Sequence, residues 1–157
     1  MTLLSCMRKI GRGAIFRNKV TNEIQTTHIS LRPYLDLLRN MNDYDNHDLI
    51  AFEYNKTTDT IFSALIHRTI RGQAQGGLRF CSYESDKDLI FDGIRLSRGM
   101  SRKNALAGLW WGGGKGIILE PKKSSYDRNK LFNDYGLFVS SLGGSYVTAE
   151  DVGTTIK

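Results

Sequence analysis

A run of four glycines around a single lysine constrains this chain more than any other feature of its sequence. The segment Gly112-Gly-Gly-Lys-Gly116 leads into the apolar residues 117–119. Glycine lets the backbone approach a ligand closely and tolerates φ > 0, so we expect Lys115 in a loop where a reactive side chain meets a ligand. Lys103 precedes Lys115 by twelve residues, and an acidic turn over 149–154 follows. Together these residues predict a site that handles an amine.

This segment does not match the phosphate-binding loops that combine glycine with lysine. A P-loop requires a glycine and a Ser or Thr at the positions that Leu109 and Gly116 occupy here. A dinucleotide fingerprint follows a strand and opens a helix, whereas residues 112–116 are expected to follow a helix and precede a strand, with Ile117 in place of the last glycine. The sequence therefore predicts no cofactor-binding residue in this chain.

Size and composition predict one globular domain. The chain has 157 residues, of which 40% are hydrophobic and 24% charged, which is enough for a core. No apolar run approaches the roughly 18 residues of a membrane span. Cys6 and Cys81 provide neither a disulfide framework nor metal-ligand spacing. We therefore expect an intracellular, reducing compartment, no metal and no membrane partner.

The net charge of +6 is concentrated at the N-terminus. Residues 1–33 contain six basic residues and one acidic residue, so the rest of the chain carries a net charge of only +1. A balanced body offers no basic face, and we expect no nucleic-acid partner. We interpret residues 1–33 as a basic N-terminal extension. Two interpretations of it stay open: a transit peptide, which would place the protein in mitochondria and not in the cytoplasm, or a plain extension or extra strand.

Hydrophobic periodicity after residue 33 predicts alternating helices and strands. A 3.6-residue period indicates helices over 34–41, 86–105 and 127–140. Runs rich in β-branched and aromatic residues indicate strands over 49–54, 61–70, 78–82, 117–119 and 146–148, the first two forming a hairpin, while 71–77 is expected to be a glycine-rich loop. The predicted fold class is α/β, with a mixed sheet covered by helices.

Four motifs, in this order and spacing, resemble one known family. They are Gly76-Gly-Leu-Arg-Phe80, Gly99-Met-Ser-Arg-Lys-Asn-Ala105, Gly113-Gly-Lys-Gly116 and Ala149-Glu-Asp-Val-Gly-Thr154. The chain resembles the N-terminal dimerisation and substrate-binding domain of the glutamate, leucine, phenylalanine and valine dehydrogenases. The stretch before Gly76 is more similar to the leucine/phenylalanine branch. We therefore assign residues 34–157 to such a domain.

The resemblance implies roles for three charged residues. Lys103 matches the family's lysine for the substrate α-carboxylate, Lys115 its catalytic lysine, and Asp151 its carboxylate that exchanges protons with the amino group and water. A partly desolvated lysine near a second cation, here expected to be Lys103, has a lowered pKa and can act as a base near neutral pH. Each residue also has a simpler interpretation. Lys103 would be a solvated lysine at a helix end, Lys115 a lysine in a turn, and Asp151 a cap of the next element.

The segment around Gly76 implies substrate contacts. Gly76 and Gly77 are expected to let the backbone close over the substrate, and Arg79 to be a structural ion-pair partner. The family sets side-chain specificity just before the two glycines, with lysine in the glutamate branch and an apolar residue in the leucine branch. Gln75 occupies this position and fits neither branch, so the preferred amino acid stays open.

In the family, a Rossmann domain that binds NAD or NADP follows the acidic turn, and this chain reaches Lys157 without one. We therefore expect the cofactor to bind through a C-terminal domain absent from this chain. The complete protein is expected to be a homo-oligomer that converts an L-amino acid to a 2-oxo acid and ammonia. The alternative is a non-catalytic module that self-associates or binds a small amino or oxo acid.

Overall fold

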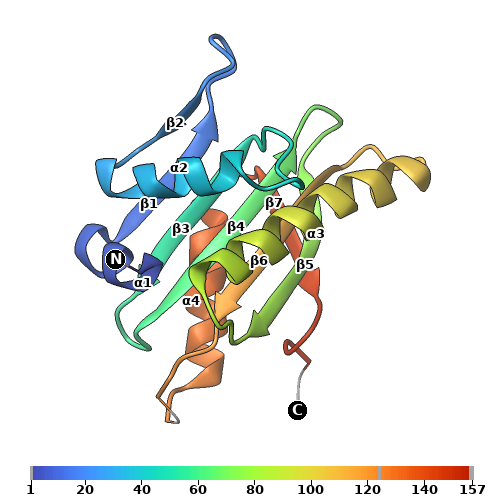
Figure 1. The fold of residues 1–157 in the computed structure, drawn as a ribbon. Coiled ribbons are helices and arrows are strands. Elements are labelled where there is room, and N and C mark those ends of the chain that lie inside the picture. Colours follow the sequence, from blue (N-terminus) through green and yellow to red (C-terminus); the bar gives the residue numbers. More distant parts are fainter. Residues whose placement is uncertain (1, 124, 156–157) are drawn as a thin grey trace.

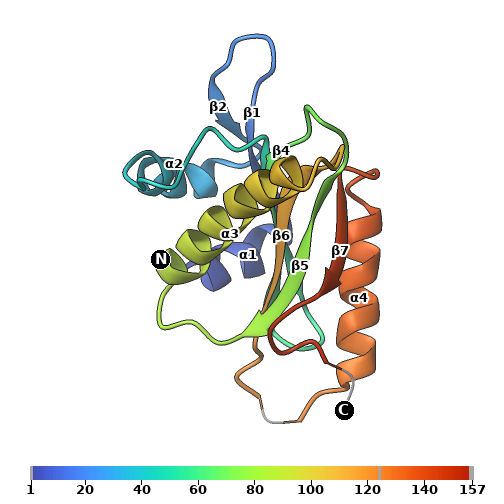
Figure 2. The ribbon, with the colours of Figure 1, turned by 90° about the vertical axis from the view of Figure 1, so that its right-hand side faces the viewer.

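The computed structural model describes residues 2–123 and 125–155. The chain folds into a mixed sheet with helices on both faces (Figures 1 and 2). The helices are α1 (Leu3–Ile10), the short 3-10 helix η1 (Ile29–Leu31), α2 (Arg32–Arg39), α3 (Asp86–Leu106) and α4 (Arg128–Ser140). The strands are β1 (Arg12–Arg17), β2 (Ile24–Thr26), β3 (Leu49–Asn55), β4 (Thr60–Arg68), β5 (Ala74–Cys81), β6 (Gly112–Leu119) and β7 (Tyr146–Glu150). No helix among these residues is both long and apolar enough to cross a bilayer.

The sheet is antiparallel at one side and parallel at the other. Its strand order is β2-β1-β3-β4-β6-β5-β7, with antiparallel pairs from β2 to β6 and parallel pairs from β6 through β5 to β7. The crossovers β5-α3-β6 and β6-α4-β7 run in opposite directions along the sheet. Because such crossovers share one hand, α3 and α4 cover opposite faces (Figure 2). The predicted α/β class and the hairpin of β3 and β4 are confirmed.

Each face of the sheet has its own core. On one face, α1, α2 and α3 pack on residues such as Phe52 and Leu65, which are fully buried. On the other face, the rings of Phe62, Tyr135 and Phe138 pack against one another, with centroids 5.4–6.3 Å apart. The sheet is therefore covered on both faces, and β4 and β6 are buried along almost their whole length.

Residues 3–31 are part of the same folded body. Helix α1 buries Leu3, Cys6 and Met7, and its first turn is capped because the Thr2 hydroxyl accepts from Ser5 N at 3.2 Å. Strand β1 pairs with β3 along five residues. The segment that we interpreted as an extension therefore adds a helix and two strands, which goes further than the extra-strand interpretation. The 3–4 residue spacing of its apolar positions was the available signal.

Residues 74–77 and 112–116 lie in central strands, so our prediction of loops was wrong there, whereas 71–73 form the turn expected at the start of the 71–77 segment. Within β6, a Cβ added to Gly114 would lie 2.6 Å from the Tyr146 ring, and one added to Gly116 would overlap the Tyr135 hydroxyl. No glycine in this strand has a positive φ. Likewise a Cβ on Gly76 in β5 would overlap the carbonyl of Gly114. Glycine is required here for close packing and not for a turn, and a strand without side chains has no hydrophobic period to detect.

Gly114→Ala should therefore reduce the free energy of unfolding by about 1–3 kcal/mol, because the methyl group must displace the buried Tyr146 ring. Urea denaturation of the purified chain measures this. The matched control is Gly136→Ala in α4, where a Cβ would meet nothing within 4 Å and should add up to about 1 kcal/mol of stability. Equal effects of the two substitutions would contradict the packing argument.

Candidate active site

A cleft of about 680 Å³ is lined by α3, by one face of β5 and β6, and by the end of β7. Among the residues that line it are five of the six predicted site residues: Gln75, Gly77, Lys103, Lys115 and Asp151. The sixth, Gly76, is buried in β5 beside Gly114 and does not line the cleft. Residues from four separate parts of the sequence thus meet at one place.

Alternation along β5 selects the side chains that reach the cleft. Gln75, Gly77 and Arg79 are partly exposed and line it, whereas the residues between them are buried. A Cβ on Gly77 would lie only 2.7 Å from Cβ of Asp151. The missing side chain therefore provides the space into which Asp151 fits, which differs from the substrate-closing role that we expected of this glycine.

Lys115 and Asp151 form an ion pair at the base of the cleft. Lys115 Nζ donates to Oδ2 of Asp151, and the two side chains are 5% and 30% exposed. Burial lowers the pKa of Lys115, and the hydrogen bond and charge of Asp151 offset this only in part. The lowered pKa makes the neutral amine more accessible near neutral pH than that of a solvated lysine.

Asp151 is held by its own turn. Its backbone N–H donates to the Thr154 hydroxyl at 2.8 Å, and its carbonyl accepts from Thr154 N at 3.2 Å. Burial alone would raise the pKa of Asp151, but the hydrogen bond and charge of Lys115 outweigh it, so the pKa lies below its ordinary value. The carboxylate is therefore ionised at neutral pH. Its neighbour Glu150 is the last residue of β7 and also lines the cleft.

The second cation beside Lys115 is Arg79, which the sequence analysis treated as structural, and not Lys103 as expected. Arg79 Nε lies 3.5 Å from Oδ2 of Asp151, and its charge lowers the pKa of Lys115 further. Arg79 also bonds to Asp92 at 2.6 Å, so its structural role exists as well. Its place on the cleft face of β5 could have been found from the Gly-Gly-Leu-Arg alternation.

Lys103 lies at the rim of the cleft, in the last turn of α3. The next residue, Asn104, is buried, and its side-chain amide donates to the carbonyl of Gly112 at 2.7 Å. This bond fixes the end of α3 against the start of β6, and so fixes Lys103 relative to Lys115. Six lining residues are cationic and three are anionic, so the cleft favours a carboxylate ligand.

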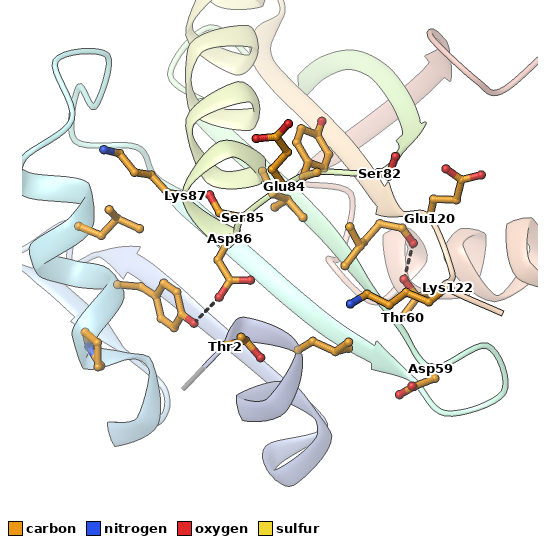
Figure 3. Close-up of a pocket in the computed structure, with 17 residues that line it drawn as sticks. Thr2, Asp59, Thr60, Ser82, Glu84, Ser85, Asp86, Lys87, Glu120 and Lys122 are labelled. Atoms are coloured by element: carbon orange, nitrogen blue, oxygen red, sulfur yellow. Dashed lines mark hydrogen bonds between the residues drawn. The ribbon is translucent and has the colours of Figure 1, made fainter.

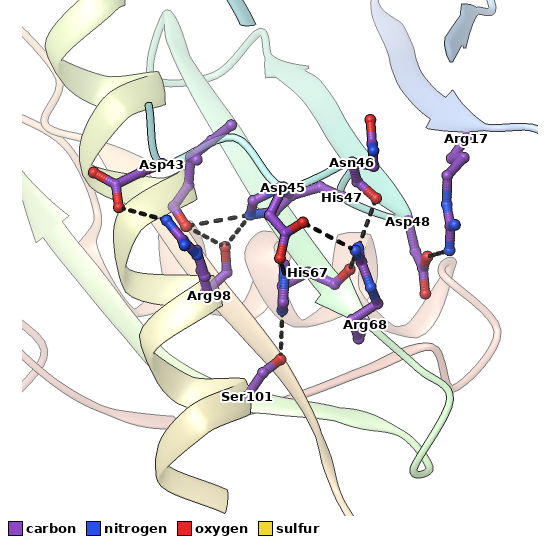
Figure 4. A network of polar contacts seen from close by, with 12 residues as sticks. Arg17, Asp43, Asp45, Asn46, His47, Asp48, His67, Arg68, Arg98 and Ser101 are labelled. Atoms are coloured by element: carbon purple, nitrogen blue, oxygen red, sulfur yellow. Dashed lines mark hydrogen bonds and ion pairs between the residues drawn. The ribbon is translucent and has the colours of Figure 1, made fainter. Parts of the chain in front are cut away.

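A buried histidine network holds one wall of the cleft (Figure 4). His67 lies between Ser101 Oγ at 2.7 Å and Asp45 Oδ2 at 3.1 Å, and His47 lies 3.0 Å from Ser97 Oγ. Burial lowers the pKa of His67, and lowers that of His47 to about 3, so both rings are neutral at pH 7. The network ties the loop before β3 to α3. Sequence reasoning missed it because its members are far apart in the chain.

A second cavity, of about 550 Å³, lies near the start of α3 (Figure 3). It mixes acidic, basic and apolar side chains, and its Tyr34 hydroxyl donates to Asp86 at 3.1 Å. Asp86 also accepts from the backbone N–H of Leu3, which joins α1 to α3. None of the predicted site residues lines this cavity.

The lowered pKa of Lys115 should appear in stability. A lysine whose pKa is lower in the folded than in the unfolded chain destabilises the fold at low pH, and this penalty disappears as the pH rises from the folded pKa towards ~10.4. The free energy of unfolding of wild type should therefore rise relative to Lys115→Met over that window, by about 1.4 kcal/mol per unit of pKa lowering. Urea unfolding at pH 7 to 10 measures this, with the exposed Lys56→Met as control. A difference that does not change with pH would contradict the burial argument.

Known proteins place this domain in a family. Residues 49–157 match the model of the Glu/Leu/Phe/Val dehydrogenase dimerisation domain. The chain is 41% identical to leucine dehydrogenase of Geobacillus stearothermophilus over 124 residues (78% of this chain, 33% of the relative), and 41% identical to valine dehydrogenase of Streptomyces coelicolor over 115 residues (73% and 31%). The crystal structure of L-tryptophan dehydrogenase from Nostoc punctiforme gives a TM-score of 0.66 at 34% identity (77% and 34%). The chain spans about one third of the length of these relatives, and it belongs to the Glu/Leu/Phe/Val dehydrogenase family.

Proposed function

We propose that this chain forms the substrate-binding half of an amino-acid dehydrogenase that converts an L-amino acid to a 2-oxo acid and ammonia with NAD or NADP. The observation that carries the proposal is a buried lysine, Lys115, paired with Asp151 in a cationic cleft that Lys103 borders. The activities named for the relatives, which are leucine, valine and tryptophan dehydrogenases, support it.

In this proposal each charged residue serves one part of the substrate. Lys103, at the rim, binds the α-carboxylate as a flexible point charge. Asp151 binds the substrate ammonium, a charge-assisted contact that the low dielectric of the cleft strengthens. The two charges thereby orient Cα before reaction.

Lys115 acts as the base once Cα has been oxidised to an iminium carbon. Water must then attack that carbon and lose a proton, and the Lys115 amine accepts it. Asp151, in contact with Lys115 Nζ, exchanges a proton with the departing amino group. The lowered pKa of Lys115 supports this role because the base must be neutral when water arrives.

The dinucleotide is not held by this chain in our proposal. A pyrophosphate requires a glycine-rich turn between a strand and a helix, and residues 2–123 and 125–155 form their glycine-rich segments as strands β5 and β6 instead. We propose that NAD or NADP binds to a further domain. We also propose self-association, because the matching family model is described as a dimerisation domain. An intracellular location, in the cytoplasm, stays a prediction.

Two substitutions test the assignment in a polypeptide that joins this chain to a dinucleotide-binding domain. Lys115→Ala should lower kcat by several orders of magnitude, because the proton transfer occurs only after substrate binds. Lys103→Ala should act mainly on KM, because the carboxylate contact exists in ground and transition states alike. Steady-state kinetics with a panel of L-amino acids measures both. A kcat near wild type for Lys115→Ala would sink the proposal, and binding without turnover in wild type would favour the non-catalytic module.

Gln75 is proposed to set the side-chain preference, because it lines the cleft beside Gly113 and Val147. Its amide offers neither an ion pair for an acidic side chain nor a dry wall for an alkyl chain. Gln75→Leu should therefore shift kcat/KM towards aliphatic amino acids by about tenfold or more. Competition assays between leucine and a polar amino acid measure the shift. An unchanged substrate ranking would assign the preference to another residue.

A further inference from the structure

Arg79 is anchored between two carboxylates at the base of the cleft. Its side chain is 20% exposed, and it bonds to Asp92 at 2.6 Å through NH1. Asp92 is itself fixed, because it accepts from the Tyr83 hydroxyl at 2.8 Å and from Arg95 at 2.9 Å. Asp92 and its partners therefore anchor the NH1 end of the Arg79 guanidinium.

The other side of the guanidinium faces Asp151. Arg79 Nε is buried and makes no hydrogen bond within the described residues, yet it lies 3.5 Å from Oδ2 of Asp151. Lys115 Nζ contacts the same oxygen atom. A buried N–H without an acceptor is unfavourable, so its persistence beside a carboxylate indicates an electrostatic role. One carboxylate oxygen is thus shared between two cations.

We infer that Arg79 is a positioning residue of this site, which shares Asp151 with Lys115 and so keeps the lysine amine from being fully paired. The inference rests on the proposed function for its meaning in catalysis. Without Arg79, Lys115 would lose a neighbouring positive charge and would gain the whole of the Asp151 carboxylate. Both changes stabilise the ammonium form of Lys115, so they act in the same direction.

Removal of the Arg79 side chain leaves the other charged residues near Lys115 in place. From α3 and the loop before β3, the charged groups that line the same cleft or act on Lys115 are Asp92, Arg95, Arg98, Arg102, Lys103 and Asp43; from the end of β7 they are Glu150 and Asp151. Tyr135 and Tyr146 lie under β6 on its opposite face, against Gly114 and Gly116. Arg79 is the one cation that shares the Lys115 partner oxygen among the residues described.

NMR titration of the purified chain tests the inference directly. Lysines labelled with ¹³C at Cε report their own protonation, and the Lys115 signal is assigned by its disappearance in Lys115→Met. In Arg79→Met the Lys115 midpoint should rise by on the order of one pH unit, so that roughly tenfold less neutral amine is present at a fixed pH below it. Arg79→Lys keeps the charge and should give a smaller rise.

The control is Arg39→Met, which removes an arginine paired with Asp36 on α2, away from the cleft, and should leave the midpoint unchanged. An unchanged or lowered midpoint in Arg79→Met would overturn the inference, as would an Arg79→Lys variant that shifts as far as Arg79→Met. If Arg79→Met does not fold, Arg79→Gln replaces it, since its amide can still donate to Asp92. The titration needs no substrate or cofactor, so failure of the proposed enzyme activity would not be mistaken for failure of this assignment.

Discussion

The site depends on one constraint, which is that glycines in β5 and β6 leave side-chain positions empty where other groups pack closely against the two strands. Gly76 and Gly114 meet backbone to backbone, Gly113 lies under Ser97 and Ser101 of α3, and Gly77 makes room for Asp151. Because the glycines take up almost no volume, they leave room on the α3 face of the sheet for the long side chain of Lys115. The helix on that face and the Asp151 turn can then close around a lysine that is 5% exposed.

Burial of the Lys115 ammonium has an energetic cost, which the neighbouring charges reduce but do not remove. A fully unpaired ammonium at this depth would be strongly unfavourable, and Asp151 offsets part of that desolvation. Stronger pairing would stabilise the fold but would fix the ammonium form. The arrangement of Arg79, Asp151 and Lys115 is therefore a compromise between stability and an available amine, as is common where perturbed ionisable groups share a cleft.

Much of the fold and part of the candidate site could be predicted from the sequence, for physical reasons that differ from element to element. Helices α3 and α4 were predicted from their apolar spacing and the β3–β4 hairpin from its β-branched and aromatic residues, and all four were found within two residues at each end. The second halves of β5 and β6 were predicted as strands, but their glycine-rich first halves were mistaken for loops, since glycine is read as a turn residue until the atoms packed against it are known. The meeting of Lys115 with Asp151 followed from motif resemblance. The role of Arg79 and the His47–His67 network could not be predicted, because both depend on contacts between distant segments.

The spacing between the two lysines has a geometric explanation in the fold. Lys103 lies in the last turn of the long helix α3 and Lys115 lies in the strand that follows, so the chain must reverse direction between them. The reversal uses Gly108 at φ 72°, a conformation that suits glycine, and Leu109 N then bonds back to the carbonyl of Asn104 at 2.9 Å. The Asn104 side chain bonds forward to Gly112 at 2.7 Å, so a single residue clamps both ends of the turn. These bonds fix the backbone positions of the two lysines relative to each other, and the flexible stem of Lys103 then gives its ammonium reach from the rim.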